Sequence, residues 1–228
     1  MRRRRPFLCK IVPEDRHFME PDFEGARAYA LARLATELPE TITYHSIQHT
    51  RDDVAPAAER LAHAEGVNGE DLLLLRTAAY FHDLGFVVRR EEHEQAGAEI
   101  AAQVLPAFGY TPVQIEKICR MIMATRIPQS PATLPEQILA DADLDTLGSE
   151  HFWQHSEKLR AENEAFDGPM SDVQWYTTQV TFIENHRYWT ATARALREPR
   201  KQEHLRQLRK LLDHARRRAS DAPKSCLS

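Results

Sequence analysis

Apolar residues recur at three- and four-residue intervals along most of the chain, and this spacing is typical of amphipathic helices. It predicts helices over residues 22–38, 41–64, 70–84, 94–108, 111–125, 136–147, 172–196 and 199–218. Pro56 is expected to kink the second helix, and Thr111 with Pro112 forms a typical helix start. No convincing strand or repeat is present in the sequence. The fold class is therefore predicted to be all-α, a single helical bundle with additional C-terminal helices.

The same pattern divides the chain into three predicted parts. They are an N-terminal tail (1–20), a helical bundle (21–198), and a C-terminal amphipathic helix with its tail (199–228). The last helix carries an apolar stripe of Leu205, Leu208, Leu212 and Ala215, while residues 194–218 hold ten Lys and Arg. Packing on the bundle with a solvated basic face is the favoured interpretation, and docking of an acidic partner is the alternative. The arginines at positions 2–5 are expected to belong to a disordered tail.

Composition narrows the class of protein. The chain is 42% hydrophobic and 28% charged, with only 8 Gly in 228 residues, which is ordinary for a globular protein. No run of about 18 apolar residues predicts a membrane span, and the basic start has no signal-peptide apolar stretch after it. Three widely separated cysteines without a CxxC motif argue against disulfides and thiolate zinc sites, and favour a cytoplasmic location. The net charge of -4 argues against general nucleic-acid binding.

Several ionisable residues lie where the pattern predicts burial. His82 and Asp83 end the apolar segment LLLLRTAAYFHDL, which reads as a central helix, and Asp143 lies in the acidic run DADLD. Buried charges are costly unless they are paired or bind a cation. His45 and His49 are four residues apart and would share one face of a helix. Residue spacing alone also allows a structural interpretation, with capping acids and a hydrogen-bonded core histidine.

Order along the chain adds to this picture. The segments YHSIQHT, FHDLG and ILADADLDTLG form the series H…HD…D, which resembles the signature of the HD-domain phosphohydrolases. The resemblance covers residues 44–148, nearly half of the chain. The neighbouring segments EEHEQAGAEIA and ATRIPQSP also resemble a bacterial branch of predicted HD hydrolases that has no established substrate. The resemblance implies a helical bundle of the HD-domain type.

The resemblance also implies a metal site. Its ligands would be His49, His82, Asp83 and Asp143. Asp143 is preferred over Asp141 because the family places this ligand in an Ala-Asp-hydrophobic context, with Asp141 as a neighbouring residue or a cap. Two imidazoles and two carboxylates suit a divalent transition metal, Mn, Fe, Zn, Co or Ni, without choosing among them.

Three further residues are catalytic candidates. His45 matches the general acid of the cyclic-nucleotide branch, and His93 follows the HD pair as phosphate-contacting histidines do in several HD hydrolases. Arg126 could neutralise a substrate phosphate. Each has a structural alternative: a helix-start histidine, an exposed helix start and a helix C-cap, respectively.

Other polar residues near these motifs have weaker claims. Asp53 lies four residues after His49 and is a candidate to orient it. His151 and His155 are rejected as ligands because no acids with suitable spacing surround them. His186 is expected to be structural.

The leading hypothesis is hydrolysis of a small phosphate ester, a nucleotide or cyclic nucleotide, through a metal-activated water. A nucleotide-sensing or partner-docking module without turnover is the alternative. An iron-dependent HD oxygenase is disfavoured because His93 is the only histidine between Asp83 and Asp143. The expected partner is a small phosphorylated molecule, and assembly into a homo-oligomer stays open.

Overall fold

The computed structural model describes residues 20–221, and all regular structure in that range is helical, without a strand. The α-helices are α1 (Phe23–Glu37), α2 (Ala55–Ala64), α3 (Gly69–Phe81), α4 (His93–Val104), α5 (Pro112–Ala124), α6 (Leu134–Asp143), α7 (Phe152–Asp167), α8 (Asp172–Asn185) and α9 (Ala191–Asp221). A π-helical segment, η1 (His49–Val54), precedes α2. Short 3-10 segments, η2 (Leu84–Val87), η3 (Leu105–Phe108) and η4 (Asp145–Gly148), follow α3, α4 and α6. The predicted all-α fold class is confirmed.

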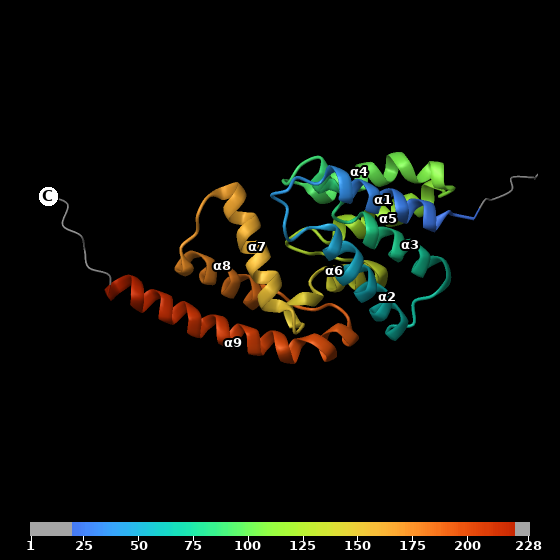
Figure 1. Cartoon of the computed structure of the whole chain (residues 1–228). Helices are drawn as coiled ribbons and strands as arrows, with labels where there is room; N and C mark the ends of the chain where they lie inside the picture. The colour runs from blue at the N-terminus through green and yellow to red at the C-terminus, as the bar shows by residue number, and fades with distance from the viewer. Residues whose placement is uncertain (1–19, 222–228) are drawn as a thin grey trace, which may run out of the picture.

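The first six helices pack together as one group around a continuous apolar core (Figure 1). Helix α3 supplies Leu74, Leu75 and Phe81 to this core, and each of these side chains is fully buried. Its burial on several sides explains the all-round apolar pattern of the sequence. The ends of α3 and α6 and the start of η1 meet in this group, and these are the segments that carry the candidate ligands.

The last three helices form a second group beside the first, with α9 as a long helix along one side (Figure 1). Their own core includes Phe152 of α7, Ile183 of α8 and Leu208 of α9. Two later residues, Tyr188 and Ala193, belong to the core of the first group instead. The segment between α8 and α9 therefore joins the two groups.

The predicted helix over 41–64 is shorter than expected. Residues 41–46 form turns and bends, so His45 and His49 do not share a helix face. The chain then makes the wide turn of η1 before α2, and Pro56 lies in the first turn of α2. Helical hydrogen bonding continues up to this point, since Ala55 N–H donates to the backbone oxygen of Thr50, and Pro56 then has no N–H to donate. At the position of the expected kink, the helix changes from π-helical to α-helical hydrogen bonding.

The C-terminal helix boundaries also differ from those predicted. Helix α7 has no counterpart among the predictions, and the helix predicted over 172–196 breaks after Asn185. Pro199 lies inside α9 and does not start it, so the predicted domain boundary at 198/199 falls within one helix. Burial of Ala193 before Pro199 and of Leu205 after it holds both halves of α9 against the protein.

Other local predictions are confirmed. Thr111 caps α5 in a capping box with Gln114, and Pro112 follows it. In α9 the stripe of Leu205, Leu208, Leu212 and Ala215 is buried, as the packing interpretation predicts. None of the helices within residues 20–221 combines the length and the apolar character needed to cross a membrane. The predicted tail at positions 1–20 lies, but for Glu20, outside the described residues.

Candidate metal centre

His49 is the first residue of η1, and its side chain is buried. Its Nε2 atom lies 3.3 Å from Oδ1 of Asp143 and 3.7 Å from Oδ2 of Asp83. On the other side of the ring, Nδ1 faces Oδ2 of Asp53 at 3.7 Å, the residue that the sequence suggested could orient it. π-helical turns are frequent at functional sites. Here the turn carries His49 at the point where the chain enters the bundle.

His82 and Asp83 follow the last residue of α3 and are almost fully buried. Nδ1 of His82 donates to the backbone oxygen of Ala79 at 2.8 Å, because a carbonyl can only accept. The opposite ring nitrogen, Nε2, then lies 3.2 Å from Oδ2 of Asp83 and 3.4 Å from Oδ1 of Asp143. The backbone of α3 thus fixes which ring nitrogen faces the two carboxylates.

Asp143 and Asp141 occupy different environments although they are two residues apart. Oδ1 of Asp143 approaches both His49 and His82. Asp141 is buried elsewhere, where it accepts hydrogen bonds from the backbone N–H groups of Trp189 and Thr190, each at 2.8 Å, and from the Thr190 hydroxyl at 2.7 Å. The structure therefore brings Asp143 to the histidines, and Asp141 fixes the segment before α9.

The four side chains suit a divalent cation. One ligand atom from each of His49, His82 and Asp83 lies within 4.8 Å of the others, and Asp143 adjoins both imidazoles. Nε2 of His82 and Oδ2 of Asp83 are buried without a hydrogen-bond partner. Unpaired buried polar atoms are costly, and a cation between them removes that cost. Two imidazoles and two carboxylates form a donor set that suits divalent transition metals.

The electrostatics of the cluster support the same interpretation. Burial lowers the pKa of His49, but its hydrogen bond to Asp143 and the nearby carboxylates of Asp53 and Asp83 outweigh it and raise that pKa to about 9. His82 likewise has a pKa well above its usual value, because the neighbouring aspartates outweigh its burial. Burial raises the pKa values of Asp83 and Asp143, but the facing imidazoles hold both below the usual range. The two carboxylates therefore favour positive charge at this position, which a divalent cation would supply.

His45 and His93 both pack against Phe86 beside this cluster. The His45 and Phe86 rings stack with centroids 4.4 Å apart, and the Phe86 and His93 rings stack at 4.0 Å. Nε2 of His93 lies 3.6 Å from Oδ1 of Asp83. The ring of His45 is 6.1 Å from that of His49, centroid to centroid. The structure thus brings both predicted catalytic histidines to the ligand cluster.

Close backbone packing holds His93 in this position. A side chain at Gly85, in the HDLGF segment, would collide with the backbone oxygen of His93. Glu92 has a φ of 55°, the only positive value at a non-glycine residue within 20–221, and it precedes His93 directly. Such backbone conformations cluster at functional sites. Glycine in the HDLG motif therefore allows α4 to begin against the ligand-bearing end of α3.

Glu162, which the sequence did not single out, positions His45. Nδ1 of His45 donates to Oε1 of Glu162 at 2.6 Å, and the backbone N–H groups of Tyr44 and His45 donate to Oε2. Burial raises the pKa of Glu162, but the hydrogen bond and charge of His45 outweigh it and hold that pKa below its usual value. No local signal marks Glu162, because it lies in the unpredicted helix α7, 117 residues after His45.

Arg126 differs from the other catalytic candidates in its surroundings. Its side chain is half exposed, and its ion pair is with Glu92, the residue before His93, at 3.6 Å. Arg126 therefore approaches the segment that leads into His93 but contacts no candidate ligand. Its role as a phosphate ligand stays a prediction.

The rejected histidines lie outside the cluster. His151 is exposed beside Glu150, and His155 contacts Asp53 at 3.7 Å without reaching the ligand group. His186 contacts Lys201 instead.

Comparison with known proteins places this geometry in a family. The family model of the HD domain matches residues 46–146, whereas no curated protein matches the chain. A predicted HD superfamily hydrolase from an uncultured Thermotogales bacterium is 23% identical, with a TM-score of 0.54 over 82% of this chain and 91% of that one. A protein from Lactobacillus plantarum is 19% identical, with a TM-score of 0.60 over 85% of this chain and 97% of that one. At these identities, the two solved structures establish a shared fold.

The matched segment contains every residue of the candidate ligand cluster, from His49 to Asp143. Glu162, in contrast, lies beyond its end. The H…HD…D series, the all-helical fold and the family match agree. Residues 46–146 are therefore identified as an HD domain.

Proposed function

We propose that this protein is a metal-dependent phosphohydrolase that acts on a small phosphate ester, a nucleotide or cyclic nucleotide. The observation that carries the proposal is the convergence of His49, His82, Asp83 and Asp143 in a buried cluster with unpaired polar atoms. A divalent cation held there supplies Lewis acidity, which stabilises negative charge on a phosphoryl group and acidifies water. The protein side chains around the cluster then have separate tasks.

His45 is the general acid in this proposal. Glu162 accepts from Nδ1, which leaves Nε2 as the atom that can give a proton to a leaving oxygen. A carboxylate at Nδ1 stabilises the imidazolium form, which is the form that carries that proton. In the reaction a water oxygen bonds to phosphorus, the ester P–O bond breaks, and the ester oxygen takes the His45 proton. A proton from the water returns to His45, so that alcohol and phosphate are the products.

His93 and Arg126 are proposed to hold the substrate phosphate. His93 lies beside Asp83 and is fixed at its other nitrogen, where Nδ1 donates to the backbone oxygen of Arg90 at 3.1 Å. Its Nε2 can donate to a phosphate oxygen when that nitrogen is protonated as well. Arg126 offers a guanidinium group that can bind phosphate in a bidentate manner, provided that it releases Glu92.

Metal analysis joined to a substrate screen tests the proposal. Purified protein should contain or take up about one divalent transition metal per chain, measured by elemental analysis. After loading with Mn²⁺ or Fe²⁺ it should hydrolyse at least one member of a panel of nucleoside phosphates, cyclic nucleotides and nitrophenyl phosphates. Asp83→Ala should abolish both metal retention and turnover.

Two outcomes would contradict parts of the proposal. Full metal occupancy in Asp83→Ala would remove Asp83 from the ligand set. Stable metal binding without turnover of any phosphate ester, with every divalent metal tried, would favour a nucleotide-sensing module over an enzyme.

A further inference from the structure

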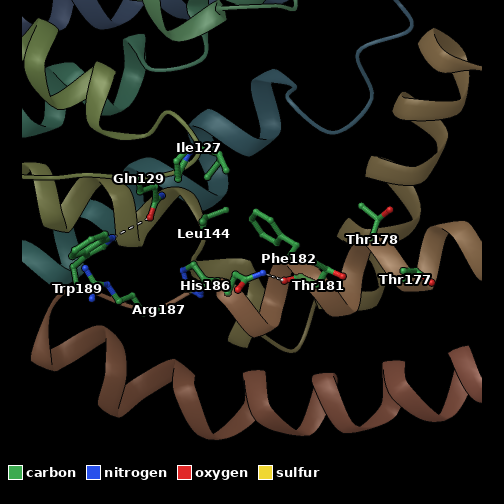
Figure 2. A pocket seen from close by; sticks show the side chains of 12 residues that line it. Ile127, Gln129, Leu144, Thr177, Thr178, Thr181, Phe182, His186, Arg187 and Trp189 are labelled. Atoms are coloured by element: carbon green, nitrogen blue, oxygen red, sulfur yellow. Dashed lines mark hydrogen bonds between the residues drawn. The ribbon is translucent and has the colours of Figure 1, made fainter.

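A pocket of about 580 Å³ lies between the loop after α5, the end of α6 and helix α8 (Figure 2). Its apolar walls come from these three segments and from the one after α8, namely Ile127, Pro128, Leu144, Phe182 and Trp189. Pockets of roughly 300–1,000 Å³ with mainly apolar walls and a few polar groups typically bind small organic molecules. This pocket is separate from the ligand cluster in its lining residues, and the proposed reaction gives it no role.

The aromatic wall of the pocket is held firmly. Nε1 of Trp189 donates to Oε1 of Gln129 at 3.1 Å, as the dashed line in Figure 2 shows, and Nε2 of Gln129 donates to the backbone oxygen of Ala140 at 2.9 Å. The guanidinium of Arg187 lies 4.2 Å from the centre of the Trp189 ring. A fixed indole and a phenyl ring in one pocket favour flat aromatic ligands, because stacking on aromatic side chains stabilises a bound base by about 1–3 kcal/mol.

The charge of the lining narrows the ligand further. The twelve residues that line the pocket include no Asp or Glu, and Arg187 is their one permanently charged member. His186 also lines the pocket, but burial and the charge of Lys201 lower its pKa to about 4, so its imidazole is neutral near pH 7. The hydroxyl and amide groups of Thr178, Thr181 and Asn185 add polar atoms. The pocket therefore suits an aromatic group that is neutral or carries negative charge.

The pocket is also continuous along the chain with two predicted site residues. Leu144 follows Asp143, the candidate metal ligand, and Ile127 follows Arg126, the predicted phosphate ligand. Consecutive Cα atoms are about 3.8 Å apart, so the pocket begins one residue away from each. The lining of the pocket therefore adjoins the candidate site residues at two points along the chain.

We infer that this pocket binds the aromatic heterocycle of the substrate, which makes the substrate class a phosphate ester of a nucleoside. The inference rests on the proposed function in that it takes the ligand to be the substrate, whereas the binding of a nucleoside can be tested without that function. Trp189 and Phe182 supply the contacts to the ring, and the absence of acids in the lining admits the adjoining phosphate.

Binding of a nucleoside without phosphate tests the pocket alone. Adenosine and uridine are titrated into metal-free protein by calorimetry, and at least one of them should bind. Thr178→Trp should weaken that binding at least tenfold, because Thr178 lines the pocket and is exposed enough for an indole to fill the space without disturbing the core. Thr36→Trp is the matched control: both threonines are exposed on a helix and donate to the backbone oxygen four residues earlier, but Thr36 is on α1, outside the pocket. Phe182→Leu should also weaken binding, since it keeps an apolar wall and removes the ring.

A pair of substrates then connects the pocket to turnover. Thr178→Trp should raise KM for adenosine monophosphate about tenfold and leave KM for ribose 5-phosphate unchanged, because the second molecule has the same sugar and phosphate without the base. Absence of nucleoside binding to the unaltered protein, or equal affinity in Thr178→Trp and Thr36→Trp, would overturn the inference. Nucleoside binding that Thr178→Trp weakens, in a protein that hydrolyses no phosphate ester, would support the pocket and refute the proposed function.

Discussion

The two helix groups of this protein contribute to the candidate site in different ways. Helices α1–α6 and η1 supply all four candidate ligands, and the HD-domain match lies within this part of the chain. Helices α7–α9 supply no candidate ligand, but Glu162 of α7 holds His45, and Trp189 and Thr190 engage Asp141. The difference teaches that one group brings the candidate metal ligands together, while the other positions the residues around them.

The aspartates of the DADLD segment show this difference between the two helix groups within a few residues. Asp143 faces the imidazoles of the first group, whereas Asp141 accepts three hydrogen bonds from the segment that leads into α9. A third acid, Asp145, pairs with Arg197 of α9 at 2.7 Å and with Arg60 of α2 at 3.0 Å. Of three acids in similar sequence context, one therefore faces the imidazoles of the candidate site, and the other two have structural environments.

The largest expected effect separates Asp143 from Asp141. Asp143→Asn should lose most bound metal and reduce turnover by about 10³-fold or more, since Lewis-acid stabilisation is worth several kcal/mol. Asp141→Asn is the matched control, the same substitution two residues away, and should keep its metal while losing stability by about 1–3 kcal/mol because a buried hydrogen-bond network is weakened. Elemental analysis and urea unfolding measure the two effects. Metal loss in Asp141→Asn, with Asp143→Asn still loaded, would reverse the two assignments.

The next effect concerns His45, which belongs to the boundary between the groups. His45→Ala should retain metal and slow turnover about 10²–10⁴-fold, because a general acid is lost while all four candidate ligands remain. Elemental analysis beside steady-state kinetics makes the measurement. His155→Ala is a suitable control, since His155 contacts Asp53 but no candidate ligand. If His45→Ala sheds its metal, His45 is itself a ligand.

The candidate cluster was predictable because its signals are local. Each ligand lies in a short motif that combines an ionisable group with an apolar surrounding, as His82 and Asp83 do at the end of α3. The resemblance to HD phosphohydrolases then supplied the grouping of His49, His82, Asp83 and Asp143, which the structure brings together. The sequence also favoured Asp143 over Asp141, but the reason, three hydrogen bonds to residues 48 and 49 positions later, is visible only in the fold.

The second group was less predictable for a physical reason. The buried face of α7 consists of Phe152, Ser156 and Glu162, so an apolar pattern does not reveal the helix. Glu162 is one of three glutamates in α7, and its partner lies 117 residues earlier, so nothing nearby distinguishes it. In α9, tertiary packing keeps Pro199 inside a helix that local rules would begin or end there.

Acid sensitivity gives a smaller effect, confined to the second group. Burial and the positive charge of Lys201 lower the pKa of His186 to about 4, although Glu198 and Asp143 act in the opposite direction. In the unfolded chain the pKa of a histidine is about 6.5. Between pH 4 and 6.5 the unfolded chain therefore binds more protons than the folded protein does. The free energy of unfolding should decrease by about 2–3 kcal/mol as the pH falls through that window. Urea unfolding at pH 7 and pH 4.5 should show a smaller loss in His186→Gln than in the unaltered protein. His63→Gln, at a histidine that is 62% exposed, should behave like the unaltered protein. Equal losses in all three proteins would contradict the assignment.

The smallest expected effect tests whether α7 takes part in catalysis or only in folding. Glu162→Gln keeps an oxygen for the N–H groups of Tyr44 and His45 but presents an amide to Nδ1, so it no longer stabilises the imidazolium of His45. We expect kcat to fall about tenfold near neutral pH with KM little changed, which corresponds to a charge-assisted hydrogen bond worth about 1.5 kcal/mol. Glu164→Gln is the control on the same helix: Glu164 also accepts from a side chain and a backbone N–H, those of Arg160 and Met170. The double variant with His45→Ala distinguishes the two roles independently, since a residue that acts through His45 should add no further loss once His45 is gone.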